Sequence, residues 1–281
     1  MTEIFDPNEL KKLYQPDHNS GGEDNGQVTI IGGSRLFHGA PLLSLKVASR
    51  IVDMTFFASP EKSVGMIAEQ IKSKLCSFIW IPWNDAEAYI AKSDAVLIGP
   101  GLMRFGSEKT PEDLRDQDNH EEGKLTRQIT EKFLKTFPDK KWVIDAGSLQ
   151  TMEADWIPKG AILTPNRKEY ILLFGDLGVK EASKKYDCVI VEKGPTTFVY
   201  SPDKSLEINN GNPGLTKGGS GDVLAGLTVA LYAKNEAFLS ACAASYLTKA
   251  AADELFQKAG TLYNADDLAD KIPAIFVDRI R

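Results

Sequence analysis

The sequence predicts an α/β fold in which a mostly parallel central sheet carries helices on both of its faces. Three observations lead to this prediction. The 281 residues, of which 42% are hydrophobic and 26% charged, are enough to bury a sizeable core. Short runs rich in β-branched residues alternate with longer helix-like segments, as in successive βαβ units. Glycine-rich turns follow several of these runs, where open α/β sheets bind their ligands.

The predicted elements follow from the hydrophobic pattern and from local start and stop signals. Short apolar runs predict strands at residues 28–31, 95–98, 142–144, 161–163 and 188–191. Helical patterns are found at residues 41–50, 124–137, 166–174, 222–233 and 236–256. The first of these helices is expected to begin with Pro41, where the missing N–H of proline costs no hydrogen bond. Connections of this length suit right-handed crossovers between parallel strands.

We expect residues 1–281 to form a single domain without a separate lid domain. No linker rich in proline, glycine or serine divides the chain. The polar stretch 107–124 predicts a surface excursion. The residues ahead of the first predicted strand, about thirty in number, are too few for another domain.

Composition argues against several classes of partner. The 33 basic and 39 acidic residues give a net charge of −6 without a basic patch, so nucleic acid is not an expected partner. No signal peptide or long apolar run is visible, which predicts a cytoplasmic protein that does not enter membranes. The three cysteines are widely spaced and indicate neither a disulfide framework nor a zinc site. The four tryptophans share no single face and suit core or interface positions, as in a homo-oligomer.

Glycine-rich turns follow the first two predicted strands. One runs through Gly32-Gly33-Ser34 to His38-Gly39-Ala40-Pro41 and would present free helix N–H groups beside the crevice. The other, Gly99-Pro100-Gly101-Leu102, would let the backbone approach a ligand closely. A Gly-Pro-Gly turn taken alone more often only reverses the chain.

A polar pair follows the strand predicted at residues 161–163. Asn166 and Glu169 are three residues apart, so they share one face of the next helix. Such a pair commonly forms a capping box, worth about 1 kcal/mol of helix stability. Beside a phosphate-binding crevice the same pair could instead organise Mg²⁺ and its water molecules. The residues alone leave both interpretations open.

The most specific segment comes late in the chain. It contains Gly211-Asn212-Pro213-Gly214 and then Lys217-Gly218-Gly219-Ser220-Gly221-Asp222, ahead of a long apolar helix. Successive N–H groups and the helix dipole would form an anion hole for a phosphoryl group. Asp222 in the first helical turn would take the proton of a substrate hydroxyl. Capping alone would not need so many glycines.

Taken together, these segments resemble the NAD(P)H-hydrate dehydratases of the ribokinase-like superfamily. The G-x-G-D motif of the superfamily is similar to Gly219-Ser220-Gly221-Asp222, and its N-x-x-E motif is similar to Asn166-x-x-Glu169. The similarity to the dehydratases lies, in matching order, in residues 30–34, 39–40, 99–102, 163–165, 193–194 and 211–214. It covers nearly the whole chain, up to a closing helix around residues 265–268.

The resemblance implies an activity and a set of site residues. ADP or ATP with Mg²⁺ would phosphorylate a hydroxyl of hydrated NADH or NADPH, phosphate would then be eliminated, and an epimerase on a separate chain would be the functional partner. Asp222 would be the catalytic base, and Glu169 would bind Mg²⁺ through water. Substrate contacts match Ala40, Gly101, Asn166 and Asp222. Nucleotide contacts match Lys193, Gly194, Pro195, Thr196, Thr197, Gly218, Gly219, Ser220 and Gly221.

The chain also departs from the family pattern. Where the family commonly has His-Pro-Gly-Glu, residues 166–169 are Asn-Arg-Lys-Glu, and its Asp-Ala-Asp-Ala-Leu corresponds to Asp145-Ala146-Gly147-Ser148-Leu149. The segment 193–197 would, without the family, be a plain β-turn. A ribokinase-like kinase for a small alcohol, such as a vitamin precursor, would use the same Asp222 without the elimination step. A non-catalytic nucleotide-binding regulator is a third class, against which an intact Asp222 argues.

Overall fold

The computed structural model of the protein describes residues 2–105 and 114–280. Ten strands of these residues join one sheet in the order β1-β10-β9-β8-β7-β6-β5-β2-β3-β4. Their bounds are β1 Glu3–Ile4, β2 Gln27–Ile31, β3 Met54–Ala58, β4 Ile79–Trp80, β5 Ala95–Ile98, β6 Lys141–Ile144, β7 Ile162–Leu163, β8 Val189–Glu192, β9 Thr197–Tyr200 and β10 Ser205–Ile208.

Helices connect and cover these strands. The α-helices are α1 Gly39–Ala48, α2 Lys62–Ile71, α3 Ala86–Lys92, α4 Leu114–Thr136, α5 Ala146–Thr151, α6 Arg167–Phe174, α7 Val179–Tyr186, α8 Ser220–Lys234, α9 Ala237–Ala259 and α10 Ala265–Ile280. Short 3₁₀ helices lie at η1 Pro7–Lys12, η2 Trp83–Asp85, η3 Ala154–Trp156 and η4 Pro213–Thr216.

The sheet is parallel throughout except at β9, which runs antiparallel to both β8 and β10. From β2 the chain adds β3 and β4 on one side, and then returns to add β5, β6, β7 and β8 on the other. The strand order therefore reverses between β2 and β5, the kind of position at which doubly wound sheets open a ligand crevice.

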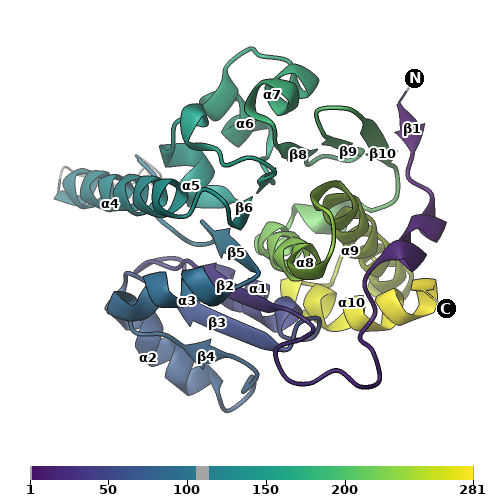
Figure 1. The fold of residues 1–281 in the computed structure, drawn as a ribbon, viewed down its shortest axis with the longest axis horizontal. Helices are drawn as coiled ribbons and strands as arrows, with labels where there is room; N and C mark the ends of the chain where they lie inside the picture. The colour runs from purple at the N-terminus through teal and green to yellow at the C-terminus, as the bar shows by residue number, and fades with distance from the viewer. Residues whose placement is uncertain (1, 106–113, 281) are drawn as a thin grey trace.

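Helices cover both faces, as the sequence predicted. Side chains of a strand alternate between the faces, and β5 shows this clearly. Ala95 and Leu97 join the core beneath α1, α2, α8, α9 and α10, whereas Val96 and Ile98 join the core beneath α3, α4, α5, α6 and α7. Figure 1 shows α8, α9 and α10 gathered on one side of the molecule, and α4, α5, α6 and α7 on the other.

The five predicted strands coincide with β2, β5, β6, β7 and β8 to within one residue at either end. The helices α1 and α4 begin earlier than predicted. Pro41 is the third residue of α1, because the turn already begins at Gly39. The helix predicted from residue 124 begins at Leu114, so the expected surface excursion is helical over most of its length; residues 106–113 lie outside the described part. Polar residues such as Glu, Gln and Lys are good helix formers, so a polar stretch need not be a loop.

The helix α8 is buried on all sides between the sheet and the helices α1 and α9. At its C-terminal end, the Lys141 ammonium donates hydrogen bonds to the carbonyl oxygens of Tyr232 (3.0 Å) and Asn235 (3.3 Å). A cation at this end satisfies carbonyl groups that have no partner within the helix. Within the described chain, no helix is both long and apolar enough to cross a bilayer.

The first strand, β1, lies at one edge of the sheet and pairs in parallel with β10. Glu3 aligns with Leu206 and Ile4 aligns with Glu207. The Phe5 N–H continues the ladder by donating to the Glu207 carbonyl at 2.9 Å. The N-terminal segment is thus fixed to a strand that comes late in the sequence.

Candidate active site

The strands β2, β5, β6, β7 and β8 are parallel neighbours, so their carboxyl ends lie side by side along the same edge of the sheet, the one formed by strand ends. The segments that follow them are the glycine turns after β2 and β5, Asp145 after β6, Asn166 shortly after β7, and Lys193 after β8. The start of α8 reaches the same edge, since a Cβ added to Gly221 would lie 3.5 Å from the Lys193 ammonium nitrogen.

The turns after β2 and β5 pack directly on each other. The Gly33 N–H donates to the Pro100 carbonyl at 2.8 Å. Gly99 has a φ of +123°, and a Cβ there would lie 1.8 Å from the Asp145 carbonyl oxygen. A Cβ on Gly101 would lie 3.2 Å from the Cβ of Ala40, so these two predicted substrate contacts are neighbours. Glycine is needed at residue 99 for this close backbone packing.

The pair Asn166 and Glu169 forms a complete capping box at the start of α6. The Asn166 side chain accepts hydrogen bonds from the N–H groups of Lys168 (2.9 Å) and Glu169 (3.0 Å). The Glu169 carboxylate accepts from the Asn166 N–H at 2.8 Å and from the Gln150 side chain at 2.9 Å. The capping interpretation of this pair is therefore realised, and Glu169 is buried while it caps.

The start of α8 differs from that of α6, because its N-cap is Gly219, which has no side chain to cap the first turn. Its φ is +94°, and the first turn that follows contains Ser220, Gly221 and Asp222. The Ser220 N–H donates to the Lys217 carbonyl at 3.3 Å, and the Val223 N–H donates to the Gly219 carbonyl at 3.1 Å. Such a terminus offers N–H groups and the positive end of the helix dipole to an anion.

An ion pair between a partly buried lysine and a buried aspartate lies beside this terminus. The Lys193 ammonium is 3.1 Å from the Asp145 carboxylate, which also accepts a hydrogen bond of 2.7 Å from the Thr164 hydroxyl. Burial alone would lower the pKa of Lys193, but the negative charges of Asp145 and Glu169 raise it above its usual value. Lys193 is therefore held as a cation at the floor of the crevice.

The pKa values of two carboxyl groups near Lys193 are raised as well, which for a carboxyl group favours the neutral form. Burial, together with the negative charge of Asp145, raises the pKa of Asp222 to about 7, although Lys193 opposes the shift. Burial also raises the pKa of Glu169, again against the charge of Lys193. A carboxyl group with a pKa near neutral pH is well matched to accept and release a proton.

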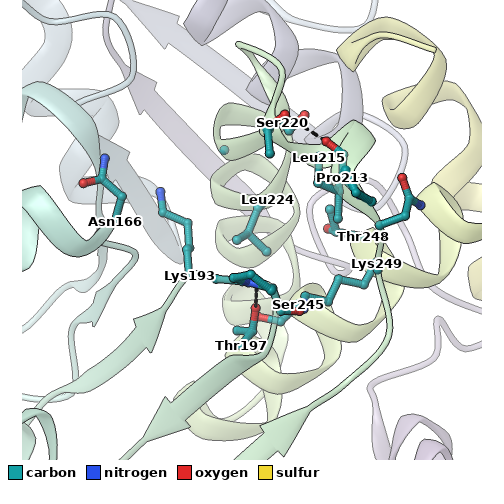
Figure 2. Close-up of a pocket in the computed structure, with 16 residues that line it drawn as sticks. Asn166, Lys193, Thr197, Pro213, Leu215, Ser220, Leu224, Ser245, Thr248 and Lys249 are labelled. Carbon is teal, nitrogen blue, oxygen red and sulfur yellow. Dashed lines mark hydrogen bonds between the residues drawn. The ribbon is translucent and has the colours of Figure 1, made fainter. Parts of the chain in front are cut away.

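A cavity of about 570 Å³ opens beside these residues, a volume typical of small-molecule sites. In Figure 2, Ser220 and Leu224 of α8 lie between Asn166 and Lys193 on one side and Thr248 and Lys249 of α9 on the other. The residues that line it are Asn166, Lys193, Gly194, Pro195, Thr197, Gly211, Asn212, Pro213, Leu215, Thr216, Ser220, Gly221, Leu224, Ser245, Thr248 and Lys249.

The cavity brings together seven of the predicted site residues: Asn166, Lys193, Gly194, Pro195, Thr197, Ser220 and Gly221. Asp222 and Glu169 are not among its described lining residues, but both interact electrostatically with Lys193, which does line it. Thr196 and Gly219 adjoin lining residues in the chain, and Gly218 lies one residue further away. Ala40 and Gly101 also lie outside the lining, at the turns after β2 and β5.

Sequence reasoning assigned no role to Asp145, Thr248 or Lys249. Asp145 was noted only as part of a departure from the family pattern, although its place directly after a buried strand was a usable signal. Thr248 and Lys249 lie within the apolar pattern of α9, where a single lysine is usually taken as a solvated residue. Among the described residues, no three His, Cys, Asp or Glu side chains cluster closely enough to hold a metal ion by themselves.

Solved structures share this architecture. A ribokinase-like superfamily protein from Enterococcus faecalis superposes with a TM-score of 0.78 at 19% identity, covering 99% of this chain and 96% of that one. An ADP/ATP-dependent NAD(P)H-hydrate dehydratase from Bacillus subtilis, co-crystallised with ATP and Mg²⁺, gives 0.73 at 22% identity, covering 99% of each chain. The protein is thus an α/β protein of the ribokinase-like fold, as predicted.

Sequence comparison identifies the family more closely. A family model described as NAD(P)H-hydrate dehydratase matches residues 28–274. A bifunctional NAD(P)H-hydrate repair enzyme of Methanocaldococcus jannaschii is 35% identical over 274 residues, which are 95% of this chain and 51% of that protein. An ADP-dependent (S)-NAD(P)H-hydrate dehydratase of Cenarchaeum symbiosum is 27% identical, covering 90% of this chain and 88% of that one. The chain belongs to the NAD(P)H-hydrate dehydratase family.

The chain spans about half the length of the bifunctional relatives that it matches, with 51%, 48% and 52% of their residues covered in three of them. The region in common is therefore one part of those longer proteins.

Proposed function

We propose that the protein dehydrates hydrated NADH or NADPH in a reaction that consumes the terminal phosphoryl group of ADP or ATP. One observation carries the proposal. Asp222, with a pKa raised to about 7, lies in the first turn of the uncapped helix α8, next to the partly buried Lys193 and a cavity of about 570 Å³. The family and the names of its members supply the substrate class.

The nucleotide would lie in the cavity between α8, α9 and the segment 193–197. Apolar side chains such as Leu215 and Leu224 suit a base and ribose. The N–H groups of residues 218–221 suit the phosphates, apart from that of Ser220, which already donates to the Lys217 carbonyl. Lys193 supplies a positive charge at the boundary between these two regions. The nucleotide-binding residues proposed from the sequence, 193–197 and 218–221, are consistent with this placement.

The hydrated nicotinamide would bind on the other side of Asp222, next to Ala40, Gly101 and Asn166. As the C6 hydroxyl oxygen bonds to the transferred phosphorus, the nucleotide leaves and the Asp222 carboxylate takes the hydroxyl proton. The lone pair of the ring nitrogen then expels phosphate together with the C–O bonding electrons. Loss of a proton from the neighbouring carbon restores the double bond of the dihydronicotinamide.

Magnesium is the metal that this site fits best. Glu169 and the neighbouring Asp145 provide hard oxygen atoms, and Mg²⁺ commonly combines one or two carboxylates with water and substrate phosphates. When bound, the ion would offset the charge of the phosphate oxygens during transfer. Both Glu169 oxygens already accept hydrogen bonds, so we propose that this carboxylate acts on the ion through water.

We propose that residues 1–281 work as one domain in the cytoplasm, as a homo-oligomer. We also propose, as the resemblance implies, that an epimerase on a separate chain supplies the reactive form of the hydrate.

The direct test incubates the pure protein with hydrated NADH, Mg²⁺ and either ADP or ATP. We expect reduced-nicotinamide absorbance to recover and phosphate to be released with at least one of the two nucleotides. Failure with both, together with accumulation of a phosphorylated alcohol from another substrate, would replace the dehydratase by a small-molecule kinase that uses the same Asp222.

A further inference from the structure

Two charged residues one turn apart on α9, Lys249 and Asp253, hold two segments that line the cavity. The Lys249 ammonium donates hydrogen bonds to the carbonyl oxygens of Pro195 (2.6 Å) and Ile208 (3.3 Å). Pro195 belongs to the turn between β8 and β9, and Ile208 is the last residue of β10. Lys249 therefore fastens one side of the cavity to α9.

Asp253 holds the second of these segments, the loop 211–214. Its carboxylate accepts hydrogen bonds from the Gly211 N–H at 2.9 Å and from the Asn212 side chain at 3.0 Å. The Asn212 side-chain oxygen in turn accepts from the Gly214 N–H at 3.0 Å and from the Tyr263 hydroxyl at 2.8 Å. The loop 211–214 is thus fixed to α9 and to the segment before α10.

A lysine at residue 249 is costly for the fold. Lys249 is 6% exposed. Burial lowers its pKa to about 8, although the negative charge of Asp253 acts to raise it. Its stem packs against Gly211, where a Cβ would lie 3.0 Å from the lysine Cγ. An apolar side chain could fill this volume without burying a charge. A charge kept here despite its cost fits a role in the shape of the cavity.

We propose that Lys249 and Asp253 are positioning residues that set the spacing between the turn 193–197 and the loop 211–214, and thereby the fit of a nucleoside di- or triphosphate between them. This inference rests on the proposed function, because the cavity is assigned to the nucleotide there. Lys249 acts through two backbone carbonyl groups, Asp253 acts through the Gly211 N–H and the Asn212 side chain, and neither takes part in the phosphoryl transfer.

The test compares Lys249→Met and Asp253→Asn with a matched control, Lys258→Met, which removes an exposed lysine from the same helix. Calorimetry gives the Kd of ADP and ATP, and steady-state kinetics separate KM from kcat. We expect each positioning variant to bind nucleotide about tenfold more weakly and to show a higher KM for nucleotide. A change of this size corresponds to the loss of one hydrogen bond to a charged group. The kcat at saturating nucleotide should change less than about threefold.

A folded variant that keeps the wild-type Kd removes its residue from the proposal. Wild-type protein that binds neither ADP nor ATP would instead contradict the proposed function, so the two failures are distinguishable. Should a variant not fold, hydrogen exchange on the wild type still decides. The Gly211 amide should exchange slowly before any nucleotide is added, and exchange as fast as in an unstructured peptide would overturn the positioning role of Asp253.

Discussion

The two helices α6 and α8 both begin at the crevice, but they treat their first N–H groups in opposite ways. In α6 the Asn166 side chain accepts from two of these groups, and Glu169 closes the capping box. In α8 the N-cap is Gly219, which has no side chain to accept anything. A capped terminus has already satisfied the donors that an anion would need, whereas an uncapped one keeps them available. The comparison predicts that the start of α6 contributes side chains to the site, whereas the start of α8 contributes backbone N–H groups beside the Asp222 side chain.

The largest expected effect comes from the one acidic side chain in the first turn of α8. Asp222→Asn should keep nucleotide affinity but lose about 10² to 10⁴ in turnover, because asparagine cannot accept the proton. Single-turnover rates and thermal unfolding should be measured on the same preparation at pH 8. Since burial disfavours the Asp222 charge, we expect the variant to be no less stable than the wild type. An active but less stable variant would make Asp222 a structural residue.

The raised pKa of Asp222 also predicts a pH profile. The base works as a carboxylate, so activity should be fully present above the folded-state pKa of about 7 and should fall as the pH drops through that value. A single titrating base gives about a tenfold loss per pH unit on the acid side. The residual activity of Asp222→Asn should lack this acid limb. A limb that persists unchanged in the variant would belong to another group.

The second largest effect on the start of α8 is expected from replacing Gly219, whose backbone conformation favours glycine. An added Cβ would lie 2.5 Å from Leu43 and 2.8 Å from Ala265, and φ is +94°. Gly219→Ala should therefore lower the free energy of unfolding by about 1–3 kcal/mol. Gly218→Ala is the matched control, since a Cβ there meets no atom within 4 Å. Denaturant unfolding of both variants checks the difference, and equal stabilities would contradict the constrained start of α8.

The smallest effect is expected at the capped helix. Glu169→Gln keeps one oxygen for the cap of α6 and should cost about 1 kcal/mol or less, but it should raise the Mg²⁺ concentration needed for half-maximal turnover. Gln150→Ala is the control, because it removes the side chain that donates to the Glu169 carboxylate and leaves the carboxylate itself in place. Activity of Glu169→Gln at limiting Mg²⁺ that equals the wild type would confine Glu169 to capping.

Local patterns predicted much of this architecture, because continuous apolar runs mark buried parallel strands and dense glycines mark a helix start that must approach a ligand. They did not identify β1, β3, β4, β9 or β10, of which β1 and β4 have only two residues each and depend on the neighbours beside them. The pairing of Lys193 with Asp145 was also beyond reach, because it depends on strand order. Lys249 was missed for a related reason, since only the folded positions of Pro195 and Ile208 explain a buried lysine.

The pairing of β1 with β10 has a consequence for how the protein is made. Glu3 leaves the ribosome early, but its partner Leu206 is synthesised only after most of the sheet. The N-terminal segment must therefore wait unpaired while β2 to β8 form, and the edge of the sheet closes late in synthesis. By the same sequence of events, the start of α8 and the whole of α9 reach the crevice only after all ten described strands have been synthesised. A nascent chain that stops before residue 220 has the five strand ends but no anion hole between them.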